Sequence, residues 1–129
     1  MAKAHALLVD DDSNNLGILS ELLTLEGIGY TQVQNPAQLD SVLQSLKKID
    51  IIFLDLELPV MNGYELLEKF KQDARFGSVP VVAYTVHVSE INHARQLGFH
   101  SFIGKPLDAE QFPQQIARIL KGERVWALP

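Results

Sequence analysis

The chain has 129 residues, of which 47% are hydrophobic and 21% are charged. This length and composition fit one globular domain with an ordinary hydrophobic core, and they exclude a disordered or collagen-like chain. The absence of cysteine excludes a disulfide scaffold and a thiolate metal site, and it suits a reducing compartment.

The charge balance and the apolar runs narrow the class of partner. The formal net charge of −5 disfavours direct binding to nucleic acid, whose phosphates such a surface repels. No apolar run reaches the roughly 20 residues that span a bilayer. The early run at 6–9 stops at three aspartates, so it is not a signal peptide. We expect a cytoplasmic chain with a single domain over residues 1–129, a core at about 5–121 and a short tail at 122–129.

Short extended segments alternate with segments of helical period along the chain. The extended segments are residues 6–9, 30–34, 49–54, 79–84 and 102–103. Apolar side chains recur every three or four residues in the intervening segments, which predicts helices at about 16–23, 39–46, 66–70, 91–97 and 116–120. This order predicts an α/β fold of the (βα)5 type, with a parallel sheet covered by helices on both faces.

The composition of the five strands predicts their order in the sheet. The first, third and fourth are apolar at successive positions, which is typical of central strands buried on both faces. The second and fifth are mixed, which is typical of edge strands. With right-handed crossovers, these constraints predict a doubly wound sheet of order 2-1-3-4-5, the flavodoxin-like variant.

Residues at the helix boundaries support the same division. Residues that make good N-caps precede four of the predicted helices: Ser13, Asn35, Ser89 and Asp108. Glycines stand where three of the helices end: Gly27, Gly98 and Gly122. Pro113 falls about one turn inside the last helix, so that helix either starts later or has a distorted first turn.

Charged and polar side chains follow four of the predicted strands. In such a sheet, ligands bind beyond the carboxyl ends of the strands, near the switch point between the first and third. The first strand ends in three aspartates at 10–12 and the third in Asp55, while the fourth ends in Thr85 and the fifth leads to Lys105. Converging carboxylates repel one another unless a positive charge lies among them. Lys105 offers one such charge, and Mg²⁺ would supply more because it takes oxygen ligands.

A plainer interpretation applies to part of this group. Acidic residues after a strand often cap the next helix, and Asp12 and Ser13 fit that role alone.

These residues stand in four motifs: Leu7-Leu8-Val9-Asp10-Asp11, Asp55-Leu56-Glu57-Leu58-Pro59-Val60-Met61-Asn62-Gly63, Thr85, and Lys105-Pro106-Leu107. Together, and in their spacing, they resemble the receiver domains of two-component response regulators, such as the chemotaxis regulator. The resemblance extends from Leu7 to about Leu120. It implies a role in phosphorelay signal transduction.

The resemblance implies an aspartyl-phosphate site that works with Mg²⁺. Asp55 matches the phosphoacceptor, whose carboxylate attacks a phosphohistidine on a sensor histidine kinase or a phosphotransfer protein. Asp10 and Asp11 match the acidic pair that holds the metal, with Asp11 favoured as the direct ligand. Asp55 and the backbone carbonyl of Glu57 match the remaining protein ligands.

The same resemblance implies a conformational switch. Thr85 and Lys105 match groups that bond phosphoryl oxygens, and Pro106 matches a proline that often follows a cis peptide bond. Charge gained at Asp55 would draw Thr85 inward, and the aromatic at Phe102 would follow. The altered surface would be the face formed by the fourth helix, the fifth strand and the fifth helix.

Three residues depart from the family's pattern. Val86 stands where a small residue is usual, and its branched side chain would narrow access to the phosphoryl group and slow transfer or hydrolysis. The acidic side chain of Glu57 would either repel or orient the attacking water. Phe102 lacks the hydroxyl of the tyrosine found in some relatives, which removes partner contacts through that group.

Other side chains have bland and functional interpretations side by side. Ile18 and Leu25 lie off the main stripe of the first helix, as isolated surface residues or as a docking face for a kinase or phosphotransfer helix. Trp126 falls in the tail, away from Asp55. Four histidines lie on different predicted elements without metal-ligand spacing, so we expect surface or packing roles for His5, His87, His93 and His100.

The leading interpretation is a phosphorylation-activated switch that binds an unknown downstream protein and turns over no separate substrate. The rival enzyme is a haloacid-dehalogenase-like phosphatase, which predicts Asp10 as the nucleophile where the receiver predicts Asp55. A third class is a receiver-shaped binding module that is never phosphorylated. About nine residues follow Leu120, too few for an output domain, although the chain also fits an excised receiver. Dimerisation stays open.

Overall fold

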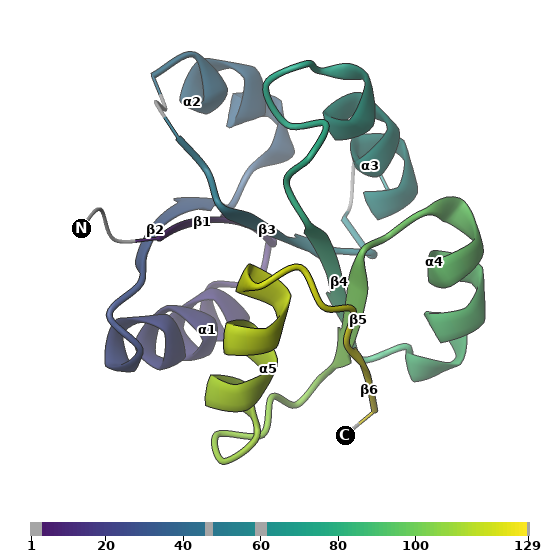
Figure 1. The fold of residues 1–129 in the computed structure, drawn as a ribbon. Coiled ribbons are helices and arrows are strands. Elements are labelled where there is room, and N and C mark those ends of the chain that lie inside the picture. The colour runs from purple at the N-terminus through teal and green to yellow at the C-terminus, as the bar shows by residue number, and fades with distance from the viewer. Residues whose placement is uncertain (1–3, 46–47, 59–61, 129) are drawn as a thin grey trace.

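The computed structural model describes residues 4–45, 48–58 and 62–128, which form a parallel sheet between two layers of helices (Figure 1). The strands are β1 (His5–Val9), β2 (Gly29–Val33), β3 (Ile51–Asp55), β4 (Val81–Thr85), β5 (Ser101–Gly104) and β6 (Trp126–Ala127). The helices are α1 (Ser13–Leu25), α2 (Leu39–Ser45), α3 (Gly63–Gln72), α4 (Ile91–Leu97) and α5 (Phe112–Leu120), with short 3-10 turns η1 (Pro36–Gln38) and η2 (Val88–Glu90). Leu46, which ends a predicted stripe, and Pro59, Val60 and Met61 of the longest motif lie outside the described residues.

The strand order confirms the predicted doubly wound sheet. The order is β2-β1-β3-β4-β5-β6, and every neighbouring pair is parallel. All five residues of β3 and of β4 are buried, as expected for central strands with helices on both faces. β2 shows the alternating burial expected of an edge strand.

The expectation that the fifth strand forms the other edge is wrong. Trp126 and Ala127, in the segment expected to be a tail, pair with Phe102 and Ile103 on the outer side of β5. In Figure 1 this short β6 lies beside β5, between α4 and α5. All four residues of β5 are buried, although its composition is mixed.

Two hydrophobic clusters fill the space between the sheet and its helices. On one face, α1 and α5 cover the sheet with regularly spaced side chains that include Leu16, Leu19, Ile116 and Ile119. On the other face, α2, α3 and α4 cover it, as Figure 1 shows. Because strand side chains alternate between faces, each strand residue belongs to one cluster.

The helix starts differ from the sequence expectations at three places. Asp12, and not Ser13, caps α1, because its Oδ1 accepts from the backbone N–H groups of Asn14 and Asn15. Ser89 lies inside η2 and caps no helix. The last helix starts later than its capping signal suggests, at Phe112, which places Pro113 in its first turn, where the missing N–H costs nothing. Asp108 caps the turn before it instead.

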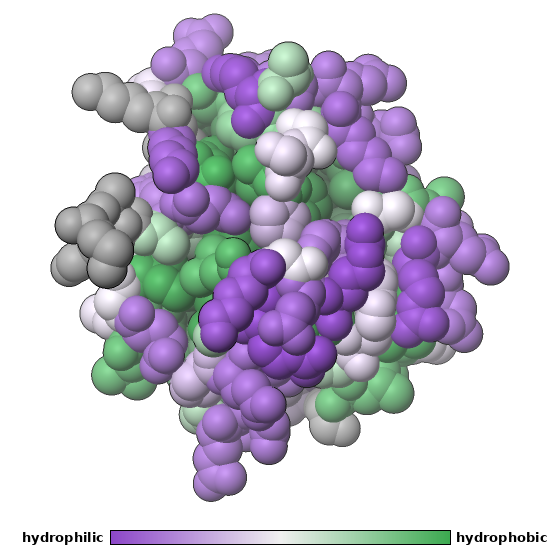
Figure 2. Space-filling view, viewed as in Figure 1, coloured by the Kyte–Doolittle hydropathy of each residue, from purple (hydrophilic) through white to green (hydrophobic). Residues whose placement is uncertain are grey.

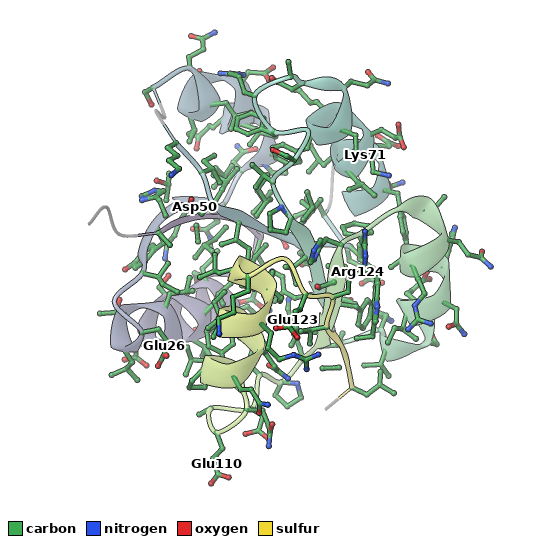
Figure 3. All side chains as sticks on the ribbon, viewed as in Figure 1. Glu26, Asp50, Lys71, Glu110, Glu123 and Arg124 are labelled. Carbon is green, nitrogen blue, oxygen red and sulfur yellow. The ribbon has the colours of Figure 1, made fainter. Side chains whose placement is uncertain are left out.

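The two ends of the sheet differ in chemistry. Asp50 precedes β3 at the amino ends of the strands and accepts a hydrogen bond from the backbone N–H of His5 at 2.8 Å (Figure 3). Hydrophilic side chains make up much of the face that Figure 2 shows, with hydrophobic ones visible between them. The carboxyl ends of β1, β3, β4 and β5 meet at the other end of the sheet. No helix in the described part of the chain is long and apolar enough to cross a membrane.

The start of α3 is packed against the end of β3 through Gly63. A Cβ added there would lie 2.7 Å from the backbone oxygen of Asp55 and 2.8 Å from Cα of Leu56. The backbone N–H of Gly63 also donates to the carbonyl of Leu56 at 3.2 Å. A glycine at this position therefore lets α3 hold the segment that carries Asp55.

Gly63→Ala is expected to lower the free energy of unfolding by about 1–3 kcal/mol, because backbone atoms cannot yield to the new methyl group as a side chain can. The control is Gly17→Ala on the exposed side of α1, where an added Cβ meets nothing within 4 Å. That variant should gain about 0.5–1 kcal/mol from helix propensity. Urea titration of both variants measures the difference, and equal effects would contradict the packing role of Gly63.

Candidate functional site

Asp10 is a fully buried carboxylate at the end of β1, and three donors surround it. Its Oδ2 accepts from the hydroxyl of Tyr84 at 2.6 Å and from Nζ of Lys105 at 3.0 Å. Its Oδ1 accepts from the backbone N–H of Asp12 at 2.9 Å. A buried charge is costly without such partners, so this carboxylate is fixed in one orientation.

Asp55 lies beside this group at the end of β3, only 6% exposed. Its Oδ1 accepts from the backbone N–H of Glu57 at 3.1 Å, and its Oδ2 lies 3.7 Å from Nζ of Lys105. Lys105 thus forms ion pairs with both carboxylates, at the shorter distance with Asp10.

Burial changes the acidity of Asp55. The pKa of its carboxyl is raised from 3.8 to about 7, chiefly because burial desolvates the charged form, and the nearby charge of Asp10 contributes to this rise. Lys105 and the backbone N–H of Glu57 oppose this rise. A bound cation would lower the pKa again by favouring the ionised form.

The acidic residues form a group with the dimensions of a metal site. Carboxylate oxygens of Asp10, Asp11 and Asp55 lie within 4.8 Å of one another. Two of these residues are buried and Asp11 is exposed, so the group opens to solvent on one side. An all-oxygen set of two or three carboxylates suits Mg²⁺, which keeps several waters. The donors present therefore fit the predicted ion. Asp12 is absent from this group, because its side chain caps α1.

Thr85 ends β4 next to the same group. It is 1% exposed; its Oγ1 accepts from the backbone N–H of His87 at 3.1 Å, and its carbonyl accepts from the N–H of Lys105 at 2.8 Å. The backbone of the Lys105 segment is thus tied to the end of β4. The peptide bond between Lys105 and Pro106 is cis, as the family resemblance implies.

A contact between two polar side chains at the surface lies next to the site. Nε2 of His87 is 2.8 Å from Oε1 of Glu57, and both side chains are about half exposed. Val86, between Thr85 and His87, is 61% exposed. The surface role expected for His87 is compatible with this pair, but its partner could not be read from the sequence, because the two residues are 30 positions apart on different loops.

Tyr84 is a site residue that the sequence analysis missed. Its hydroxyl bonds Asp10, and Nζ of Lys105 lies 4.3 Å from the centre of its ring. A tyrosine in an otherwise aliphatic buried strand was the available signal, because a buried phenol hydroxyl needs a partner. The aspartates that follow the first and third strands were the partners available to that hydroxyl.

Phe102, the predicted switch residue, lies apart from the acidic group. It is fully buried in the cluster beneath α2, α3 and α4, and it pairs in register with Ala83 on one side and Trp126 on the other. Ala83 lies two residues before Thr85, so Thr85 and Phe102 face the same side of the sheet.

The remaining candidates stay outside the site. Ile18 and Leu25 are exposed on α1, beside an open groove of about 790 Å³ that Tyr30 and Gln32 of β2 also line. The other three histidines have separate partners: His5 bonds Thr31, His93 bonds Glu90 and His100 bonds Ser101.

Comparisons with known proteins agree with the fold and with the family resemblance. The family model described as "Response regulator receiver domain" matches residues 6–117. The two-component response regulator ORR5 of Oryza sativa subsp. japonica is 29% identical over 119 residues, covering 91% of this chain and 89% of that protein. Among solved structures, the chemotaxis protein CheY4 of Vibrio cholerae has a TM-score of 0.81 at 21% identity, covering 92% of this chain and 99% of that one.

A second solved structure is similar to the same extent. The receiver domain of sensor histidine kinase PA1611 from Pseudomonas aeruginosa PAO1, with a magnesium ion coordinated in its active-site cleft, has a TM-score of 0.79 at 24% identity. It is matched over 95% of this chain and 100% of that one.

Without added metal, the free energy of unfolding should depend on pH through the titration of Asp55. The unfolded carboxyl ionises near pH 3.8 and the folded one near 7, so the folded state binds the extra proton between these values. Stability from this group is therefore lost as pH rises from about 4 to about 7, by about 3–4 kcal/mol. Asp55→Asn removes the contribution. Urea titrations from pH 4 to 8 should show a flatter or more positive slope in the variant, and parallel curves would contradict the raised pKa of Asp55.

Tyr84→Phe should lower the free energy of unfolding by about 1.5–3 kcal/mol, because a buried charge loses a donor. Tyr64→Phe is the matched control. The Tyr64 hydroxyl also donates to a carboxylate, that of Glu90 at 2.7 Å, but near the surface, and its loss should cost about 0.5–1.5 kcal/mol. Denaturant unfolding at neutral pH ranks the two variants, and an equal or larger loss in Tyr64→Phe would exclude a special role for the Asp10 contact.

Proposed function

The chain belongs to the response regulator receiver domain family, and we propose that it is a phosphorylation-activated signalling switch with Asp55 as the phosphoacceptor. The observation that carries the proposal is the convergence of the Asp10, Asp11 and Asp55 carboxylates beside the ammonium group of Lys105. Such a site accepts a group that arrives with its own negative charge only if that charge is neutralised on arrival.

Mg²⁺ is the ion that this donor set fits. The carboxylates of Asp10, Asp11 and Asp55 would hold it, together with the backbone carbonyl of Glu57. When bound, the ion neutralises charge on the transferring phosphoryl group. The magnesium ion in the active-site cleft of the PA1611 receiver domain supports this assignment by analogy.

The proposed reaction is transfer of a phosphoryl group from a phosphohistidine to Asp55. A carboxylate oxygen of Asp55 forms a bond to phosphorus while the bond between phosphorus and the imidazole nitrogen breaks, and that nitrogen keeps the electron pair. Asp55 must be ionised to attack, and Lys105 at 3.7 Å favours this form. Lys105 and the hydroxyl of Thr85 then bond phosphoryl oxygens. Since Lys105 lies closer to Asp10, it would move toward Asp55, while Tyr84 keeps a donor on Asp10.

The burial of the carboxylates argues against the phosphatase alternative. Asp10 is fully buried, and both of its oxygens accept hydrogen bonds, so it is poorly placed as a nucleophile. Oδ1 of Asp55 accepts from one backbone N–H, and its Oδ2 lies 3.7 Å from Nζ of Lys105 within the acidic group. The geometry therefore favours Asp55 over Asp10.

The proposed output is a change of protein binding. Thr85 would be drawn toward the new phosphoryl group and Phe102 would respond, altering the face formed by α4, β5 and α5. Receiver domains of response regulators act with histidine kinases or phosphotransfer proteins and with downstream effectors. For this chain we infer such a phosphodonor, an unknown downstream protein target, no direct contact with nucleic acid or membrane, a cytoplasmic location and no turnover of a separate substrate.

Incubation with acetyl phosphate and Mg²⁺ should add one phosphoryl group to the intact chain, measured by mass spectrometry. Asp55→Asn and omission of Mg²⁺ should each abolish the adduct. No adduct under any condition would favour a binding module that is never phosphorylated, whereas an adduct that persists in Asp55→Asn and disappears in Asp10→Asn would support the phosphatase-like alternative.

Val86→Ala should speed hydrolysis of the phosphorylated chain, because a smaller side chain beside Thr85 leaves water more room to reach the phosphoryl group. Because Val86 is exposed, this substitution should leave the stability of the fold unchanged. The loss of phosphorylated protein over time, followed by mass spectrometry, gives the rate constant of hydrolysis in each protein. Equal lifetimes would contradict the steric role of Val86.

A further inference from the structure

The outer side of β5 carries a strand from elsewhere in the chain. The backbone N–H of Phe102 donates to the carbonyl of Val125 at 2.8 Å, and the N–H of Val125 donates to Oγ of Ser101 at 3.0 Å. Trp126 and Ala127 continue the pairing in parallel register. In Figure 1, β6 lies beside β5 at this edge of the sheet, between α4 and α5.

The side chains of this segment hold it to both layers. Trp126 packs against the cluster beneath α2, α3 and α4, and the guanidinium of Arg95 on α4 lies 4.6 Å from the centre of its ring. Val125 is buried in the opposite cluster. Arg124, labelled in Figure 3, donates to the carbonyl of His100 at 3.4 Å.

The segment is nevertheless a peripheral part of the fold. Its strand has two residues, Trp126 is only partly buried, and the next residue, Leu128, is 58% exposed. The connection from α5, residues 121–124, is exposed throughout. Few buried contacts and an exposed connection are the properties of segments that open locally without unfolding the domain.

We propose that the outer edge of β5 is a docking surface for an extended strand with a bulky aromatic residue, and that residues 125–127 are its intramolecular occupant until Asp55 is phosphorylated. The release step rests on the proposed function. The partner is an extended protein segment that pairs in parallel with β5 and places its aromatic side chain beneath Arg95. The seated β6 itself defines this chemistry, since it shows what the edge accepts.

The structure provides a route from the acidic group to this edge. Phe102 contacts both neighbours of β5: it pairs with Ala83 of β4, two residues before Thr85, and its N–H holds Val125. A shift of Thr85 toward Asp55 would therefore reach the segment through β5. Loss of the Val125 bond and of the Trp126 packing would uncover the edge.

Binding of the segment as a free peptide tests the docking surface without phosphorylation. The host is Trp126→Ala, which contains no tryptophan, and the probe is the peptide Gly-Glu-Arg-Val-Trp-Ala-Leu, residues 122–128. A short tether gives an effective concentration in the millimolar range, so a segment that is docked when tethered should bind as a peptide with a Kd of about 1 mM or less. Its tryptophan emission should shift to shorter wavelength and saturate. Circular dichroism checks that the host is folded.

Two controls test whether the peptide binding is specific. Arg95→Gln in the same host should weaken peptide binding roughly two- to fivefold, since one cation–π contact is lost. An otherwise identical peptide with alanine in place of tryptophan should not compete. No saturable shift up to several times about 1 mM, or full competition by the alanine peptide, would overturn the docking surface.

Release is tested in the unmodified chain, where Trp126 is the only tryptophan. After acetyl phosphate and Mg²⁺, acrylamide quenching of Trp126 should rise toward that of the free peptide, and it should stay unchanged in Asp55→Asn. An adduct by mass with unchanged quenching would overturn the release step. Absence of the adduct would instead overturn the proposed function, and the peptide titration would still decide the docking surface.

Discussion

The buried negative charge of Asp10 is the constraint on which the site depends. A carboxylate without solvent is stable only with several donors, and here the donors come from three separate parts of the chain: the end of β4, the loop after β1 and the segment after β5. The charge thereby fixes how these strand ends lie relative to one another. Lys105 reaches Asp10 from the far side of β3 and β4, so a single ion pair spans the carboxyl edge of the sheet.

Asp55 occupies the less stable of the two carboxylate positions. It shares Lys105 with Asp10 at the longer distance, and burial favours its protonated form. The difference gives the two carboxylates separate roles. Asp10 accepts hydrogen bonds from three donors, whereas Asp55 gains most from any additional positive charge that enters the group.

Much of the fold and most of the site residues could be predicted from the sequence, because both follow from local patterns. Apolar runs and helical stripes determine the order of elements, and the carboxyl ends of parallel strands necessarily meet. The sequence could not reveal β6, since a strand of two residues has no period to detect. Tyr84 and the pairing of His87 with Glu57 depend on contacts between residues far apart in the chain, which no local pattern records. Asp12 and Ser13 are both good N-cap residues, so the sequence alone could not decide between them. The backbone geometry of the structure makes Asp12 the cap of α1.

The strand pairing also bears on association between copies of the chain. An uncovered strand edge presents unpaired backbone groups to any other strand, and longer edges are better templates. With β6 in place, the sheet ends on this side in a strand of two residues, which pair with Phe102 and Ile103 of β5. Loss of β6 would make the longer strand β5 the edge of the sheet, with its backbone groups open to pairing with another chain. The same two residues that end the sheet therefore also protect the chain against edge-to-edge aggregation. Substitutions that remove the packing of Trp126 should lower the solubility of the chain at high concentration.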